Sequence, residues 1–149
     1  MNGQRRGSNG ILIRSGTAGE IGTLLELWRD AETHQSATDD VAGLRTLLDC
    51  DPDAVLVAED GGDIVGALIA TFDGWRGNMY RLAVLPGRRR RGIASALVSA
   101  GESRLRSRGA RRITALVAHE QAGASEFWWS AKFELDEHTT RFVRTFSGA

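Results

Sequence analysis

The chain has few of the residues that constrain secreted, metal-binding or membrane proteins. Cys50 is the only cysteine among 149 residues, so an internal disulfide cannot form and a zinc site built from cysteines is excluded. No apolar run approaches the roughly 20 residues that a membrane-spanning helix needs. The apolar run at 11–13 that follows the polar start is too short for a signal peptide. We therefore expect a cytoplasmic protein that uses no metal and has no membrane partner.

Acidic residues are scarce in one part of the chain. Residues 76–112 contain eleven arginines and a single acid, Glu102, although the formal net charge of the whole chain is zero. Residues 20–73 carry thirteen acids against only Arg29 and Arg45. This separation predicts a positive side suited to an anionic cofactor and a negative side suited to a cationic second substrate. The alternative is that both stretches are solvated faces.

Length and apolar content predict one domain over residues 10–149, after a loose polar tail at 1–9. The order of elements is βααβββαβαββ, which predicts an α/β fold with a mixed central sheet of about seven strands and helices on both faces. Hydrophobic periodicity and turn residues predict strands at 10–15, 54–59, 64–72, 78–84, 112–118, 133–135 and 139–146. They also predict four helices. The first begins at a capping box at 17–20 and ends at a break at 34–37, the second follows that break and ends at 51–53, and the other two lie at 92–107 and 121–131.

The most informative stretch runs from Tyr80 to Leu97. An apolar strand leads into Pro86, an arginine-rich turn follows, and Gly92 precedes an apolar-periodic helix. The amide N–H groups of such a turn and of the first helical turn have no partner inside the helix, and the helix dipole adds partial positive charge. This combination predicts an anion site that fits a diphosphate, and hence a nucleotide-containing cofactor.

These residues resemble the GCN5-related N-acetyltransferase (GNAT) superfamily. Its cofactor signature [RQ]-x-x-G-x-[GA] is matched by Arg89-Arg90-Arg91-Gly92-Ile93-Ala94, behind a matching strand that contains Leu82-Ala83-Val84 and ends before Pro86. The run 124–133 resembles the motif N-x-x-A-x-x-F-Y-x-x-x-G-F, with Gln121 at its first position and Lys132 in place of its glycine. The hairpin at 72–77 is similar to that of a small bacterial YpeA-like branch. The resemblance spans residues 10–146.

The resemblance implies acetyl-CoA as the donor and a primary amine of a small molecule or peptide as the acceptor. The diphosphate would lie on the amides of the arginine turn and the helix start, with Gly92 and Ala94 allowing close approach. The pantetheine arm would pair with the fourth strand as an added strand. The residues expected to bind the cofactor are Leu82, Ala83, Val84, Arg89, Arg90, Arg91, Gly92, Ile93, Ala94, Ser95 and Gln121.

The catalytic groups are less well defined by the resemblance. Trp128 stands where the family usually has a tyrosine acid, and an indole N–H can donate a hydrogen bond but cannot release its proton at neutral pH. Asn78 and Leu116 stand where some members carry a glutamate base. The remaining candidate bases are Asp73, His119, Glu120 and Glu126, and the alternative is a water relay without a dedicated base. Tyr80 is the only tyrosine, and the direction of its side chain is open.

An acceptor cleft in this family would be built by the first two helices, their link and the hairpin before the fourth strand. Trp28, Glu32, His34, Asp39, Asp40, Trp75 and Arg76 are the candidates in this sequence. Acids and an aromatic ring would suit a cationic amine. The alternative is that the acids belong to the first turn of a helix and that Trp28 is a core residue.

Two other functions are compatible with these patterns. One is a GNAT-fold protein that binds acetyl-CoA without catalysis. The other is an arginine-driven nucleic-acid binder, which the balanced isoelectric point of about 6.8 disfavours. Homodimers are compatible with the fold, but no interface is indicated.

Overall fold

The computed structural model describes residues 5–6, 10–31, 33, 36–118 and 123–146. His119, Glu120 and Gln121, three of the expected site residues, lie outside this part of the chain. In chain order the elements are β1 (Arg5–Arg6), β2 (Ile11–Ser15), the short 3₁₀ helix η1 (Ala18–Glu20), α1 (Ile21–Asp30), α2 (Val41–Cys50), β3 (Val55–Asp60), β4 (Asp63–Phe72), β5 (Gly77–Val84), η2 (Pro86–Arg88), α3 (Ile93–Ser107), β6 (Ile113–Ala115) and α4 (Ala124–Ser130).

The strands form one mixed sheet in the order β1-β2-β3-β4-β5-β6. Neighbouring strands are antiparallel except β5 and β6, which are parallel because α3 connects them as a crossover. The expected α/β class is therefore confirmed. Arg5 and Arg6 fall within the stretch expected to be a loose tail, yet they pair with β2.

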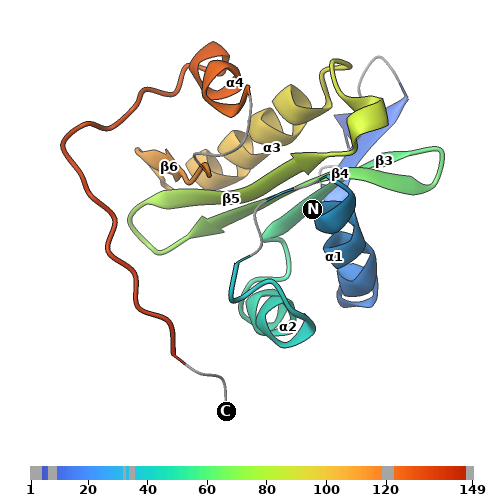
Figure 1. Cartoon of the computed structure of the whole chain (residues 1–149), viewed down its shortest axis with the longest axis horizontal. Helices are drawn as coiled ribbons and strands as arrows, with labels where there is room; N and C mark the ends of the chain where they lie inside the picture. Colours follow the sequence, from blue (N-terminus) through green and yellow to red (C-terminus); the bar gives the residue numbers. More distant parts are fainter. Residues whose placement is uncertain (1–4, 7–9, 32, 34–35, 119–122, 147–149) are drawn as a thin grey trace.

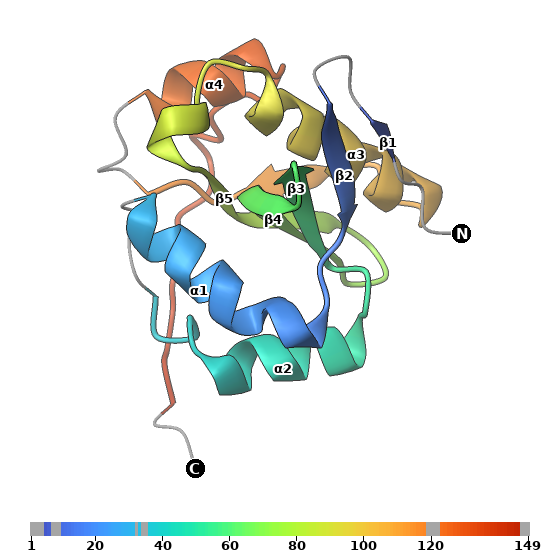
Figure 2. The same ribbon diagram turned by 90° about the vertical axis from the view of Figure 1, so that its right-hand side faces the viewer.

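Helices cover both faces of the sheet, as Figures 1 and 2 show. The helices α1 and α2 cover one face, where Leu24, Trp28 and Leu44 pack against residues of β3 and β4. On the other face, α3 packs its Leu97 and Leu105 against the sheet, and Trp128 of α4 joins the same cluster. Each helix thus buries one apolar stripe and leaves its polar side in water.

The start of α1 is held by a charged cluster that the capping box only partly predicts. The backbone N–H of Thr17 donates to the carboxylate of Glu20 at 3.0 Å. Arg14 of β2 donates to the same carboxylate at 2.7 Å and to Glu59 of β3 at 3.1 Å. The hydrogen bond from Arg14 is the main cause that lowers the pKa of Glu20. The cap therefore also attaches α1 to the sheet.

The strand β5 is irregular in its second half. The register between β4 and β5 shifts between Ala67 and Ile69, which indicates a bulge on β5. Arg81 lies at this bulge with a φ of 57°, a left-handed conformation that an arginine rarely adopts. On its other side, β5 pairs with β6 only from Gly77 to Met79. Beyond Met79 the two parallel strands part.

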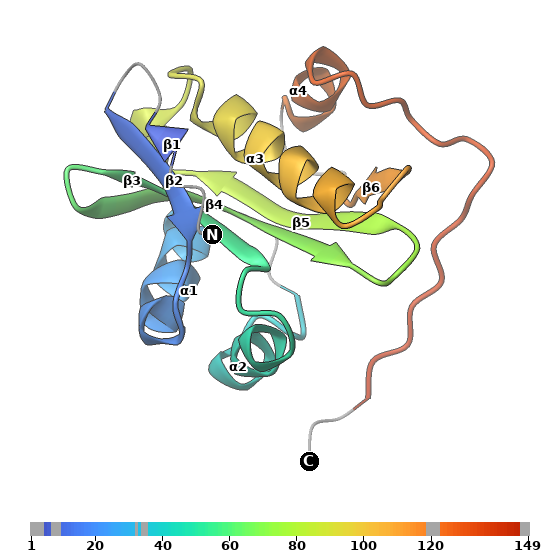
Figure 3. The ribbon, with the colours of Figure 1, turned by 180° about the vertical axis from the view of Figure 1, so that it is seen from behind.

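The expectation of two closing strands is wrong. Residues 133–146 form neither strand in the structure, and the sheet has six strands rather than seven. Figure 3 shows this segment lying away from the sheet, and Phe142 is 92% exposed. The β-branched and aromatic residues of 139–146 can form a strand only beside a suitable edge, and β6 is a short three-residue strand instead of the expected seven. Leu135, Val143 and Phe146 are also exposed.

The end of α4 keeps the turn of the family motif although its glycine is replaced. Lys132 adopts a φ of 71° there. The N–H of Phe133 donates to the carbonyl of Trp128, and the N–H of Lys132 donates to that of Trp129, both at 3.0 Å. These two bonds define a Schellman-type helix end, in which glycine is the preferred residue.

This turn predicts that Lys132→Gly stabilises the protein. Relief of the left-handed strain should raise the free energy of unfolding by about 1 kcal/mol. Urea unfolding measures the change as a higher midpoint at constant slope. Lys132→Ala is the control, since it removes the long side chain but keeps the Cβ. Equal midpoints for the two variants would contradict the prediction.

Candidate functional site

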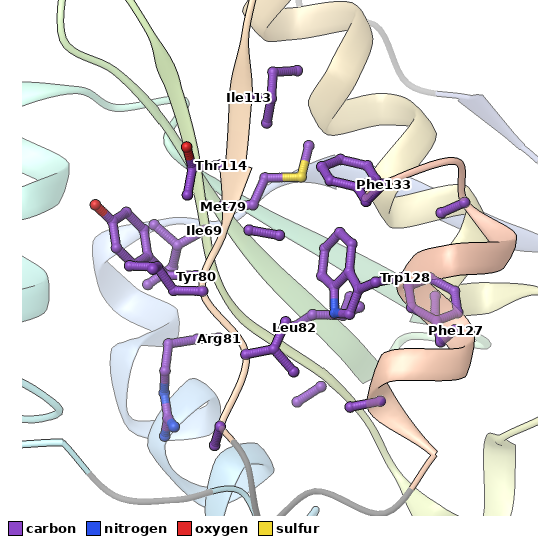
Figure 4. Close-up of a pocket in the computed structure, with 18 of the residues that line it drawn as sticks. Ile69, Met79, Tyr80, Arg81, Leu82, Ile113, Thr114, Phe127, Trp128 and Phe133 are labelled. Carbon is purple, nitrogen blue, oxygen red and sulfur yellow. The ribbon is translucent and has the colours of Figure 1, made fainter. Parts of the chain in front are cut away.

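A broad open groove runs along the side of β5 that β6 leaves. It begins at the first turn of α3, follows Tyr80 to Val84, and reaches the link between α1 and α2. The helix α4 forms its opposite wall. Figure 4 shows Met79 and Trp128 on one side of β5 and Tyr80 and Arg81 on the other. The expected cofactor strand and the expected acid position therefore line one groove.

The start of α3 offers unpaired backbone donors. The N–H of Ala96 donates to the carbonyl of Gly92 at 3.0 Å and makes the first bond of the helix, so the N–H groups of Ile93, Ala94 and Ser95 have no helical partner. No side chain caps this helix. Gly92 is its N-cap, with a φ of 78°, and a Cβ there would meet no atom within 4 Å. Open space, free donors and the positive helix end together fit a diphosphate.

The four consecutive arginines have different partners. Arg88 forms an ion pair with Asp60 of β3, and Arg91 lies 3.9 Å from the same carboxylate. Arg89 donates to the carbonyls of Val84 and Ala31, each at 3.1 Å, and so attaches the end of β5 to the end of α1. Arg90 lines the groove and is exposed. In the described part of the chain Arg90 makes no hydrogen bond or ion pair, so it is the arginine of this run best placed to meet an anion.

The second half of β5 has a main-chain edge that β6 does not cover. The last contact between the two strands is the N–H of Leu116, which donates to the carbonyl of Met79 at 3.1 Å. Leu82, Ala83 and Val84 follow and line the groove. An extended chain with amide groups could pair with this edge as a strand does.

Trp128 is a core residue at the edge of the groove. It is 8% exposed and packs edge-on against Phe127 and Phe133, at ring-centre distances of 5.4 and 4.8 Å. Figure 4 shows its indole nitrogen on the side of Leu82. The packing accounts for the tryptophan, and the direction of the N–H leaves it able to donate a hydrogen bond into the groove.

Of the candidate bases that the structure describes, Asp73 is a turn residue. Its carboxylate accepts the N–H groups of Trp75 and Arg76 at 2.8 and 2.7 Å, and these bonds, led by that from Arg76, lower its pKa. It lies in the hairpin that precedes β5, at the end of this strand away from the start of α3, and does not line the groove. Glu126 is exposed on α4 and does not line the groove either.

Arg81 lines the expected acceptor side of the groove, although it was not among the residues expected there. Its guanidinium lies 4.8 Å from the ring centre of Trp28 and 2.9 Å from Asp39. Burial lowers the pKa of Arg81, and Asp39 opposes that shift. The only signal in the sequence is an arginine between apolar strand residues.

The other candidates for the acceptor cleft have structural roles or lie elsewhere. Trp28 is 2% exposed and belongs to the core. Asp40 caps α2 by accepting the N–H of Gly43 at 2.7 Å. Trp75 is exposed in the hairpin, where Arg76 stacks on it at 4.1 Å. Glu32 and His34 lie outside the described residues.

The described residues contain neither a membrane-spanning helix nor a cluster of metal ligands. None of their helices combines the length and apolar character needed to cross a membrane. Nor do these residues bring together three or more histidine, cysteine, aspartate or glutamate side chains that could hold a metal ion.

Comparison with solved structures shows the same fold. Ard1 from Thermoplasma volcanium superimposes with a TM-score of 0.75 at 20% identity, over 85% of this chain and 84% of that one. The PaiA N-acetyltransferase from Thermoplasma acidophilum, solved in complex with coenzyme A, gives a TM-score of 0.74 at 14% identity, over 87% and 92%.

Sequence comparison identifies the family. The model of the acetyltransferase (GNAT) family matches residues 22–133. Acetyltransferases of Sodalis glossinidius and Pectobacterium atrosepticum are 32% and 34% identical to this chain; they align with 76% and 74% of it, and with 80% and 79% of their own lengths. With the fold and the groove described above, these matches lead to one conclusion: the chain belongs to the acetyltransferase (GNAT) family.

Proposed function

We propose that this protein is an N-acetyltransferase that moves the acetyl group of acetyl-CoA directly to a primary amine of a small molecule or peptide. The observation that carries the proposal is the position of two sets of backbone groups in one groove. The free N–H groups at the start of α3 lie at one end of the edge of β5 that β6 leaves. A molecule with a diphosphate and an amide-containing arm suits both sets at once.

The donor side of the site follows from these groups. The N–H groups of Ile93, Ala94 and Ser95 would hold the diphosphate, with Arg90 adding a charge-assisted bond. The edge at Leu82 and Val84 would pair with the pantetheine arm and direct the thioester toward the side of Trp128. Arg88, Arg89 and Arg91 would support the turn through their bonds to Asp60 and to main-chain carbonyls.

Acetyl-CoA supplies an activated thioester, so the reaction needs a neutral amine close to the carbonyl carbon. A C–N bond forms, the C–S bond breaks, the amine gives up one proton, and the sulfur takes one to leave as a free thiol. The groove residues that the structure describes include no histidine, and Asp73 lies elsewhere. Their carboxylates are Asp39 and Asp136, which are paired with Arg81 and Arg112, and Glu102 and Glu134, which belong to α3 and to the segment after α4. Positioning in the groove, with water as the proton carrier, is therefore the main contribution that these residues offer.

A protein that binds acetyl-CoA without catalysis is the second candidate. The replacement of the expected tyrosine acid by Trp128, which cannot release a proton, favours it. Release of free thiol on a panel of amines separates the two, because a binder gives none.

The first test replaces Gly92. Asparagine and aspartate both tolerate a left-handed conformation, have nearly the same shape and differ in charge. We expect Gly92→Asn to keep the fold and bind coenzyme A, and Gly92→Asp to bind it about tenfold more weakly or worse, since a carboxylate would face the diphosphate. Titration calorimetry at low ionic strength measures both affinities.

Equal affinities for the two variants would contradict the proposal that the diphosphate binds at the start of α3. Failure of the unmodified protein to bind coenzyme A at millimolar concentration would overturn the proposed function. Salt-sensitive retention on DNA that coenzyme A does not compete would instead support the nucleic-acid alternative.

The second test concerns Asp73. An asparagine at this position still accepts the N–H groups of Trp75 and Arg76, so Asp73→Asn should preserve the hairpin. We expect its turnover number on the best amine of the panel to stay within about twofold of the original, because a carboxylate outside the groove has no proton to take. The loss of a general base would instead slow turnover about a hundredfold or more, and such a result would make Asp73 catalytic.

A further inference from the structure

The end of the groove beside α2 contains an apolar stretch, which is bordered by the hydroxyl-bearing residues Thr33, Ser36, Thr38 and Thr71. Leu44 and Leu47 of α2, Ile69 of β4 and Tyr80 of β5 line it. Leu47 and Tyr80 are half-buried, so part of each side chain remains available for contact. This part of the groove is continuous with the edge of β5 where the thioester would lie, and α4 stands on the other side of that strand.

Asp39, which among the described residues is the acid of the α1–α2 link that lines the groove, already has partners. Asp39 forms its ion pair with Arg81 while only 9% of the aspartate side chain and 16% of the arginine side chain are exposed. The same carboxylate accepts the N–H of Ser36 at 2.7 Å. The other acids among the described residues that line the groove, Glu102, Glu134 and Asp136, belong to α3 or follow α4. An incoming ammonium group would therefore find no uncommitted carboxylate among the described residues of this end.

Bulge geometry explains why Arg81 faces this end. The left-handed backbone at Arg81 places two successive residues, Tyr80 and Arg81, on the side of α1 and α2, as Figure 4 shows. The guanidinium stacks on buried Trp28, so it closes the wall instead of leaving an acidic opening. A strained non-glycine residue kept at such a place is typical of a functional site.

This lining discriminates between amines. A polycation would bring several charges next to leucine, isoleucine and an arginine, where burial of an unpaired charge is costly. An amine with an apolar body would instead release water from both surfaces. Apolar surroundings also disfavour the charged form of the amine and lower its pKa. The reactive neutral amine would then form without a carboxylate base.

We propose that the acceptor is a primary amine on an apolar, preferably aromatic, body, and that this body lies against Leu47 and Tyr80. The proposal rests on the acetyl transfer proposed above and names its acceptor class. The bond changes are those already given: the amine nitrogen gains the acetyl group and loses a proton, and coenzyme A leaves as the thiol.

The test compares 2-phenylethylamine with spermidine, a polycation, by thiol release. We expect kcat/KM for 2-phenylethylamine to exceed that for spermidine about tenfold or more. Leu47→Asp should lower the first value about tenfold and raise the second, because it adds an uncommitted carboxylate to the apolar end. Thr46→Asp is the matched control: it places the same charge on the exposed side of α2, outside the groove lining, and should change neither value more than about twofold.

Leu47→Ala covers the case in which the aspartate variant does not fold, and it should also reduce the preference for 2-phenylethylamine. Calorimetry with coenzyme A runs beside every variant and should give unchanged affinity. Suppose that coenzyme A binds. The acceptor class is then overturned, while the proposed cofactor site stands, by any of three results: spermidine is the better acceptor, neither amine is acetylated, or the substitutions at 46 and 47 have the same effect. If coenzyme A does not bind at all, the proposed function and the acceptor class both fail.

Discussion

The structure depends most on the point where β5 loses its second neighbour. Up to Met79 the strand is paired on both sides; beyond it, β6 turns away and a bulge shifts the register with β4. Main-chain groups rarely stay unpaired inside a protein, so an open edge at the centre of a sheet needs another partner, from solvent or from a ligand. The free amides at the start of α3 lie at the end of the same edge. The groove, the proposed cofactor site and the proposed acceptor site all follow from this parting.

Most of the arginines in the turn before α3 stabilise the turn itself, whereas the sequence suggests that they would bind an anion. The arginine run is not simply an anion-binding patch, since Arg88 and Arg91 share Asp60, and Arg89 bonds to two carbonyls. Three of the four arginines thus hold the turn against β3, the end of β5 and the end of α1. The proposed anion site itself would rely mainly on backbone N–H groups and helix polarity, which act at a fixed geometry. On the acceptor side the acids are likewise committed, Asp39 to Arg81 and Asp40 to the cap of α2.

Local sequence signals predicted much of the fold because those signals act over a few residues. The helix periods of α1, α2 and α3, the glycine turn at 61–62 and the strands β3 to β5 all have their stabilising contacts encoded in patterns of two or 3.6 residues. The prediction of two closing strands was wrong because residues with strand propensity form a strand only beside a partner edge, and the length of β6 is decided by packing far along the chain. The same limit applied to Arg81, whose partners Trp28 and Asp39 are distant in sequence.

The amino-acid sequence alone predicted that the chain forms a mixed sheet with helices on both faces, and that a strand, a turn with Gly92 and a helix start follow one another as the proposed anion site requires. It could do so because glycine in a left-handed turn and unpaired amides at a helix start are properties of adjacent residues. Only the tertiary structure decided which partners the arginines of the turn have, that Asp73 belongs to a turn away from the groove, and that Asp39 is paired with Arg81 at the end of the groove beside α2. Those features depend on side chains from separate elements meeting in space, and no local pattern specifies such meetings.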